Sequence, residues 1–164
     1  MSTMVKKSDF YFGAFEFQLT NKLLKPIIII DRSDSSRTIH LETNQGRYNV
    51  FIKYSSKPRS ATSTTRRWDF SCAAKELEKI DSIANYEGKN LVALVCSEPT
   101  LTNTEIAVLD IDKAKTCLGN DSMNKTRRIS VSANKGSHHL CCYGTAVSDR
   151  NALKTSRNLD KHFA

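Results

Sequence analysis

Apolar residues recur at helical spacing near the beginning of the chain. Ser8 can cap a helix over about residues 9–24, whose predicted core face contains Phe10, Ala14, Phe17 and Leu24. Pro26 should end this helix. The run from Ile27 to Ile30 that follows is entirely β-branched, which favours a central strand buried on both sides.

Two alternating stretches come next and predict an antiparallel hairpin. They cover residues 38–43 and 47–54, and Gly46 between them can adopt the positive φ that a tight turn needs. In the second stretch, alternation assigns one face to Tyr48, Val50, Ile52 and Tyr54. Lys53 should therefore point to the opposite face.

The remainder of the chain divides into short elements. Residues 55–67 are rich in Ser and Thr without large apolar side chains, so we expect a loop there, and a helix over about 72–86 after it. The apolar run at 91–96 predicts a second buried strand. Further elements are expected as a strand at 105–111, a helix at 112–118 ended by Gly119, strands near 129–131 and 140–146, and a closing helix at 149–163.

Together these elements predict one α+β domain spanning residues 1–164, with a mixed sheet flanked by helices. We expect residues 1–7 to be flexible. The strands at 27–31 and 91–96 should be central, because they are the two continuous apolar runs.

Charge is distributed unevenly along this chain, whose formal net charge is +8. Residues 44–68 contain no carboxylate and include the cations Arg47, Lys53, Lys57, Arg59, Arg66 and Arg67. Clustered cations attract phosphate backbones regardless of base sequence, because neutralising the phosphates releases condensed counterions. The alternative is that the positive charge serves only solubility.

The basic segment leads us to expect nucleic acid or another polyanion as the partner. The predicted contacts are the six cations of residues 44–68, with Trp68, Arg127 and Arg128. We expect Trp68 to be exposed and able to stack on an unpaired base. A protein-interaction module, which offers its basic edge to an acidic partner or to a second copy in a homo-oligomer, is an alternative.

The cysteines and the apolar segments bear on the compartment. Cys72, Cys96, Cys117, Cys141 and Cys142 form no CxxC pair, which favours a reducing compartment. The sequence has neither a secretory h-region nor an uninterrupted apolar window of about 18 residues. We therefore expect a cytoplasmic protein that has no membrane partner.

The order helix, strand, strand, strand, helix, strand over residues 9–96 resembles the common core of the PD-(D/E)XK nuclease family. The resemblance implies a phosphodiesterase in which carboxylates bind Mg²⁺ and a lysine orients or activates the attacking water. That lysine would be Lys53, but the acidic position two residues earlier is Phe51, which has no oxygen to bind a metal. Candidate carboxylates are Glu42, Asp31, Asp34 and Glu16. Magnesium is expected only under this alternative.

Two further groups of residues have a simpler structural interpretation. In the run from His138 to Cys142, alternation puts only His139 and Cys141 on one face, which is too few ligands for zinc, so buried strand cysteines are favoured. Thiol catalysis there would lack a positioned oxyanion hole. Asp110 and Asp112 favour a helix cap over a cation site. We therefore predict no metal site.

Overall fold

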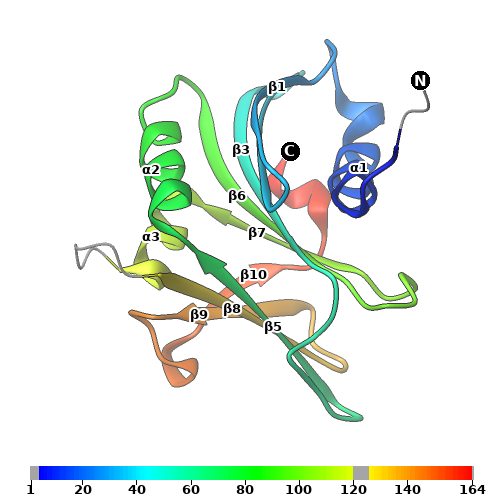
Figure 1. Ribbon diagram of the computed structural model, residues 1–164, viewed down its shortest axis with the longest axis vertical. Coiled ribbons are helices and arrows are strands. Elements are labelled where there is room, and N and C mark those ends of the chain that lie inside the picture. The colour runs from blue at the N-terminus through cyan, green and yellow to red at the C-terminus, as the bar shows by residue number, and fades with distance from the viewer. Residues whose placement is uncertain (1–3, 120–125, 164) are drawn as a thin grey trace.

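Two five-stranded sheets pack against each other in the computed structural model, which describes residues 4–119 and 126–163 (Figure 1). Sheet A has the strand order β1-β2-β3-β6-β7, and sheet B has the order β10-β9-β8-β5-β4. The predicted α+β class is confirmed. The chain forms two sheets, however, where the sequence pattern predicted one.

Sheet A is the mixed sheet. Its strands are β1 (Ile28–Arg32), β2 (Ser36–Thr43), β3 (Gly46–Ser55), β6 (Lys89–Cys96) and β7 (Glu105–Asp110). β3 and β6 are parallel, and the other neighbours are antiparallel. The predicted hairpin is confirmed as β2 and β3, with Gly46 at a φ of 128°. The buried strand predicted at 91–96 is confirmed as β6, in the interior of the sheet.

Sheet B is antiparallel throughout. Its strands are β4 (Ser60–Ala61), β5 (Thr65–Cys72), β8 (Arg127–Asn134), β9 (His139–Gly144) and β10 (Leu153–Ser156). The loop predicted at 55–67 is partly wrong, because it contains β4 and the beginning of β5. The closing helix predicted at 149–163 is also wrong, since β10 pairs with β9 and Thr155 donates a buried hydrogen bond to the Val108 carbonyl at 2.6 Å.

The described residues form three α-helices, namely α1 (Lys7–Leu19), α2 (Ala74–Ile83) and α3 (Ile111–Leu118). α2 and α3 lie where the sequence predicted helices. Asp110 occupies the N-cap position of α3, although its side chain makes no capping hydrogen bond. Residues 1–3 of the segment predicted to be flexible lie outside the described residues, and α1 already begins at Lys7.

The apolar face of α1 differs from the predicted one. Its buried apolar residues are Tyr11, Phe12, Phe15 and Leu19. Phe10, Phe17 and Leu24 are exposed by 62%, 76% and 66%, so their assignment to the core is wrong. Because apolar side chains lie on nearly every side of this helix, spacing alone could not select the face that packs on sheet A.

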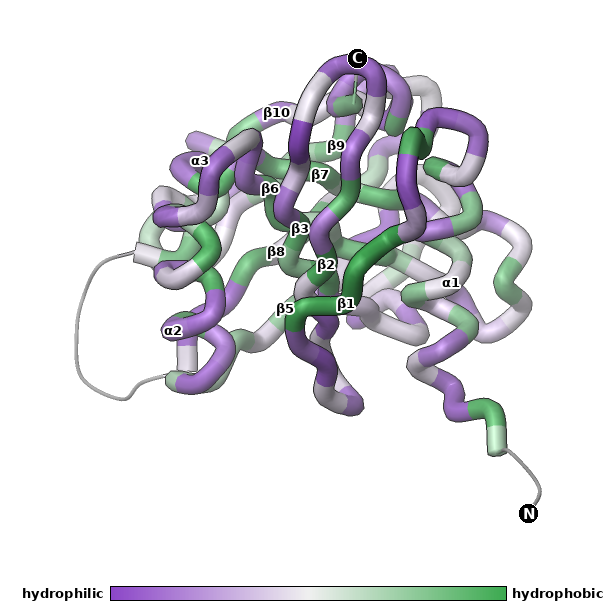
Figure 2. Tube along the Cα trace, turned by 90° about the horizontal axis from the view of Figure 1, so that it is seen from above, coloured by the Kyte–Doolittle hydropathy of each residue, from purple (hydrophilic) through white to green (hydrophobic). Residues whose placement is uncertain are grey.

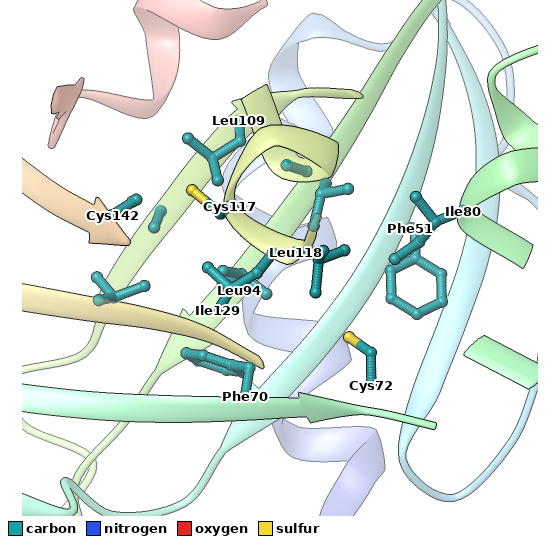
Figure 3. Close-up of a cluster of buried hydrophobic side chains, with 14 of the residues drawn as sticks. Phe51, Phe70, Cys72, Ile80, Leu94, Leu109, Cys117, Leu118, Ile129 and Cys142 are labelled. Carbon is teal, nitrogen blue, oxygen red and sulfur yellow. The ribbon is translucent and has the colours of Figure 1, made fainter. Parts of the chain in front are cut away.

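One hydrophobic core lies on each face of sheet A. The first lies between the sheets and includes Phe51, Phe70 and Leu94, together with side chains of α2 and α3 (Figure 3). The second lies between the other face of sheet A and α1, and Phe163 contributes to it. Sheet B and α1 therefore cover opposite faces of sheet A (Figure 1).

β1 is the clearest departure from the sequence prediction. It forms an edge of sheet A, and Ile28, Ile29 and Ile30 are 59%, 41% and 42% exposed. The prediction of a central strand from this isoleucine run is wrong. A β-branched run favours the strand conformation, but the position of a strand in its sheet depends on partners elsewhere in the chain.

Candidate nucleic-acid interface

Alternation along β5 separates two sets of side chains. Trp68, Phe70 and Cys72 enter the core between the sheets. Arg67 and Asp69 lie on the opposite face of the strand, as expected from the twofold period of a strand. The cations of the predicted basic segment that fall within β5 therefore lie on opposite faces of the strand.

The register of sheet B extends this second face across four strands. Asp69 is opposite Ser130 of β8, and Ser130 is opposite Tyr143 of β9. We call the surface formed in this way the outer face of sheet B. It comprises Arg59, Arg67, Asp69, Ser71, Arg128, Ser130, Ser132, Cys141, Tyr143 and Lys154.

No helix of the described residues contributes apolar side chains to the outer face of sheet B. Those of α2 and α3 belong to the core between the sheets, and those of α1 belong to the core beyond sheet A. The strands of sheet B contain one carboxylate, Asp69. The outer face thus combines four cations with a single anion.

Asp69 organises the centre of this face. Its carboxylate accepts hydrogen bonds from the Ser130 hydroxyl at 2.6 Å, from Arg67 Nε at 3.1 Å and from Arg59 Nη1. Burial by itself would raise the pKa of Asp69, but these hydrogen bonds outweigh it and hold the pKa below its usual range. Asp69 therefore stays ionised and holds two arginines side by side.

Arg67 also covers the aromatic ring of this face. Its guanidinium lies 5.3 Å from the centroid of the Tyr143 ring, and the Tyr143 hydroxyl is 3.3 Å from that of Ser132. Tyr143 is consequently only 7% exposed. The arginine is positioned by a carboxylate on one side and by an aromatic face on the other.

Arg128 lies on the same face, next to the end of β5. Arg128 is opposite Ser71 in the β5–β8 ladder, and Ser71 follows Asp69 by two positions in β5. Its Nε is buried and has no hydrogen-bond partner within residues 4–119 and 126–163. A buried donor without a partner costs free energy in the folded chain. Its neighbour Arg127 is 6% exposed and does not belong to the outer face.

The other predicted cations lie elsewhere, mostly beside carboxylates. Arg47 contacts Glu42 and Glu87 at the hairpin end of sheet A. Lys53 is buried against Glu76. Arg66 pairs with acidic residues between the sheet edges, namely Glu98 and Glu105. Lys57 is exposed and has no ion pair among the described residues. The expectation of one continuous basic edge is therefore wrong.

Trp68 is fully buried, and the expectation that it is exposed is wrong. Its Nε1 donates a hydrogen bond to the Ser97 carbonyl at 2.7 Å, and Arg66 lies 5.0 Å from its ring centroid. Trp68 belongs to the core face of β5, because strand alternation turns it away from Arg67. In this position its ring cannot stack on a base.

The residues suggested by the nuclease resemblance do not come together. Glu42 is opposite Arg47 and Lys53 is opposite Ser36, which separates them by about 20 Å along the β2–β3 ladder. Asp31 contacts Lys79 instead. The remaining carboxylates, Asp34 and Glu16, pair with Lys6 and Arg37. Within the described part of the chain, no group of three or more His, Cys, Asp or Glu residues could hold a metal ion.

Around the histidine and cysteine run, the structure agrees with the predicted alternation. Leu140 and Cys142 are fully buried, while His139 is exposed and Cys141 is half-buried. Sequence reasoning missed Asp69, Tyr143 and Lys154 as members of the outer face of sheet B. The alternation of residues 65–72 was a usable signal, but assigning 55–67 to a loop concealed it.

Comparison of the chain with protein-family models, curated proteins and solved structures finds no match. In the described ranges, every helix is too short or too polar to cross a bilayer. The chemistry of the outer face of sheet B is therefore the basis for a functional proposal.

Proposed function

We propose that this protein binds the phosphate backbone of nucleic acid through the outer face of sheet B. The supporting observation is the gathering of Arg59, Arg67 and Arg128 on a face to which no helix of the described residues contributes apolar side chains and whose strands contain one carboxylate. Lys154 of β10 adds a fourth cation. Guanidinium groups suit this role, because their planar donors match phosphate oxygens in pairs.

Asp69 fixes the arrangement of the arginines on this face before nucleic acid binds. In the free protein it neutralises part of the charge of Arg59 and Arg67 and fixes their orientation. A phosphate oxygen can replace one of these contacts, since each arginine has donors that Asp69 does not use. Backbone contacts of this kind position a nucleic acid without reading its base sequence. Binding should therefore be salt-dependent and tolerant of sequence.

Fluorescence anisotropy with labelled single-stranded DNA, duplex DNA and RNA tests the proposal. We expect binding that weakens between about 50 mM and about 200 mM salt, with log affinity falling by roughly 0.9 per duplex phosphate neutralised and roughly 0.7 for a single strand. The combined variant Arg59→Gln, Arg67→Gln, Arg128→Gln should weaken all three complexes and flatten the salt dependence. Absence of any binding at the lower salt concentration would overturn the proposal.

Arg47→Gln is the matched control for the single substitution Arg67→Gln, since each removes one arginine charge. Arg47 is a half-exposed arginine at the hairpin end of sheet A, so the substitution removes the same charge away from sheet B. If Arg47→Gln weakened binding as much as Arg67→Gln, the effect would come from net charge, and the outer face of sheet B would not be the site.

A second candidate function is a metal-dependent phosphodiesterase with a PD-(D/E)XK-like core. Its motivation is the order of α1, β1, β2, β3, α2 and β6, which β4 and β5 of sheet B interrupt between β3 and α2, with β1, β2, β3 and β6 adjacent in sheet A. It predicts cleavage of DNA with Mg²⁺ or Mn²⁺, although Glu42 lies about 20 Å from Lys53 and could not share a metal site with it. Intact DNA after incubation of the wild-type chain with either metal would argue against it.

A further inference from the structure

A hollow of about 430 Å³ lies between β1 and α2, away from the outer face of sheet B. Its volume falls within the range of about 300–1,000 Å³ that small-molecule sites occupy. Ile30 of β1 and Ile83 of α2 give it hydrophobic walls. Figure 2 shows most of β1 as a hydrophobic segment. The hollow therefore has the size and part of the lining of a ligand site.

On the α2 side, the hollow is lined by a stripe of side chains that changes in character along its length. Lys75, Lys79 and Ser82 succeed one another at intervals of four and three residues, which puts them on one side of the helix. Tyr86 follows four residues later, beyond the end of α2, and is 40% exposed. The hollow is thus charged towards the beginning of α2 and aromatic towards its end.

Thr38 of β2 provides a buried polar group without a partner. It is opposite Phe51 in the β2–β3 ladder, and Phe51 packs in the core that contains side chains of α2, so the Thr38 side chain also points towards α2. Thr38 is 5% exposed and lines the hollow. Its hydroxyl forms no hydrogen bond within residues 4–119 and 126–163. Buried hydroxyls normally have a partner, and the hollow is where one could be supplied.

Four charged side chains line the hollow, and two of them already match each other. Lys79 forms an ion pair with Asp31. Lys75 and Glu78 form no ion pair with any part of the chain that the structure describes. They are three positions apart on α2, where Cβ atoms are about 5–6 Å apart. The hollow therefore offers an available cation beside an available anion, with no excess of either charge.

We propose that this hollow binds a free α-amino acid with an aromatic side chain. Such a molecule carries a carboxylate for Lys75 and an ammonium for Glu78 on one carbon, which matches two neighbouring charges. Its ring would pack against Ile30 and Tyr86, and the Thr38 hydroxyl would gain its missing partner. A ligand with one charge alone would leave Glu78 or Lys75 facing a like charge. This inference is independent of the proposed nucleic-acid binding, which uses sheet B.

Ligand-observed NMR titrations of the full chain test the class of ligand. Phenylalanine should bind. Phenylpropionate lacks its ammonium and phenethylamine lacks its carboxylate, so each should bind at least about tenfold more weakly through the loss of a charge-assisted hydrogen bond. Free alanine, which has both charges and no ring, should also bind more weakly. Absence of phenylalanine binding at millimolar concentration, or equal binding of the three aromatic compounds, would overturn the proposal.

Substitutions test where each charge is recognised. Lys75→Gln should bind phenylalanine and phenethylamine equally, and Glu78→Gln should bind phenylalanine and phenylpropionate equally. Thr38→Val, which keeps the shape of the side chain, should weaken phenylalanine binding by about three- to tenfold. Lys113→Gln is the matched control, because it removes an exposed lysine of α3. If Lys113→Gln weakened binding as much as Lys75→Gln, or if Lys75→Gln kept the wild-type preference, the hollow would not be the site.

Discussion

Lys53 and Glu76 form a bidentate ion pair inside the protein: Nζ lies 2.8 Å from Oε1 and 2.7 Å from Oε2. Their side chains are 9% and 11% exposed. The pair joins β3 to the first turn of α2, where the Glu76 carboxylate also accepts the backbone N–H of Ala73 at 3.4 Å. The lysine that the nuclease resemblance selected is thus engaged in holding a helix on sheet A.

Breaking this pair on one side should be costly. Lys53→Ala leaves the Glu76 carboxylate buried without its cation, and we expect a loss of about 3–5 kcal/mol in the free energy of unfolding. Replacing both partners, as in Lys53→Met with Glu76→Leu, should cost much less. Urea denaturation measures both variants. Arg47→Ala, which removes an exposed cation, should change stability by less than about 1 kcal/mol.

Asp69→Asn should strengthen nucleic-acid binding. The substitution removes the only carboxylate of the sheet B strands and frees the donors of Arg59 and Arg67 for phosphate. Anisotropy titrations should show tighter binding and a steeper dependence on salt. The control is Glu87→Gln, which removes an exposed carboxylate beside Arg47. Weaker binding by Asp69→Asn in a folded protein would contradict the assignment of this face.

The same carboxylate should contribute to stability in a pH-dependent way. Because the pKa of Asp69 is lower in the folded protein, its contribution is complete above the unfolded value of about 3.9 and disappears as the pH falls through the folded pKa. Asp69→Asn should lower the free energy of unfolding by about 1–2 kcal/mol at neutral pH. The stability of this variant should also fall less steeply than that of the wild type as the pH becomes acidic. Denaturation midpoints measured from neutral to acidic pH check this, and parallel curves for both proteins would contradict it.

Trp68 provides an optical test of which face binds. It is the only tryptophan, and it is fully buried on the side of β5 opposite Arg67. Its emission should be blue-shifted, resistant to acrylamide, and unquenched by a saturating oligonucleotide. Trp68→Ala should destabilise the protein by about 3–5 kcal/mol. Strong quenching by the oligonucleotide would mean that bases reach the core face of β5.

Thiol reactivity should single out Cys141. Burial raises the pKa of Cys72 and of Cys117 to about 11, and it also raises the pKa values of Cys96 and Cys142. At about pH 8 these four thiols should react slowly in the folded protein, because the thiolate is the reactive form. Ellman titration should detect Cys141 first and all five after unfolding. Equal rates in the folded state would contradict the described burial.

Several elements could be predicted because their signals are local. The β2–β3 hairpin follows from alternation around Gly46, and β6 follows from its apolar run. The α2 helix follows from its spacing of apolar residues, and α3 follows from the Gly119 that ends it. The candidate interface was less accessible, because Arg66 and Arg67 are neighbours in sequence but lie on opposite faces of β5. Composition alone counts both as members of one cluster.

The sequence by itself determined where most strands and helices form and how side chains alternate along them, because backbone preference and periodicity depend on neighbouring residues. Tertiary structure decided which isoleucine run became an edge and which cations remained available. Lys53 is matched by Glu76, 23 positions later, and Arg66 by Glu98, 32 positions later. Such pairings depend on chain segments that only folding brings together, so no local pattern could have revealed them.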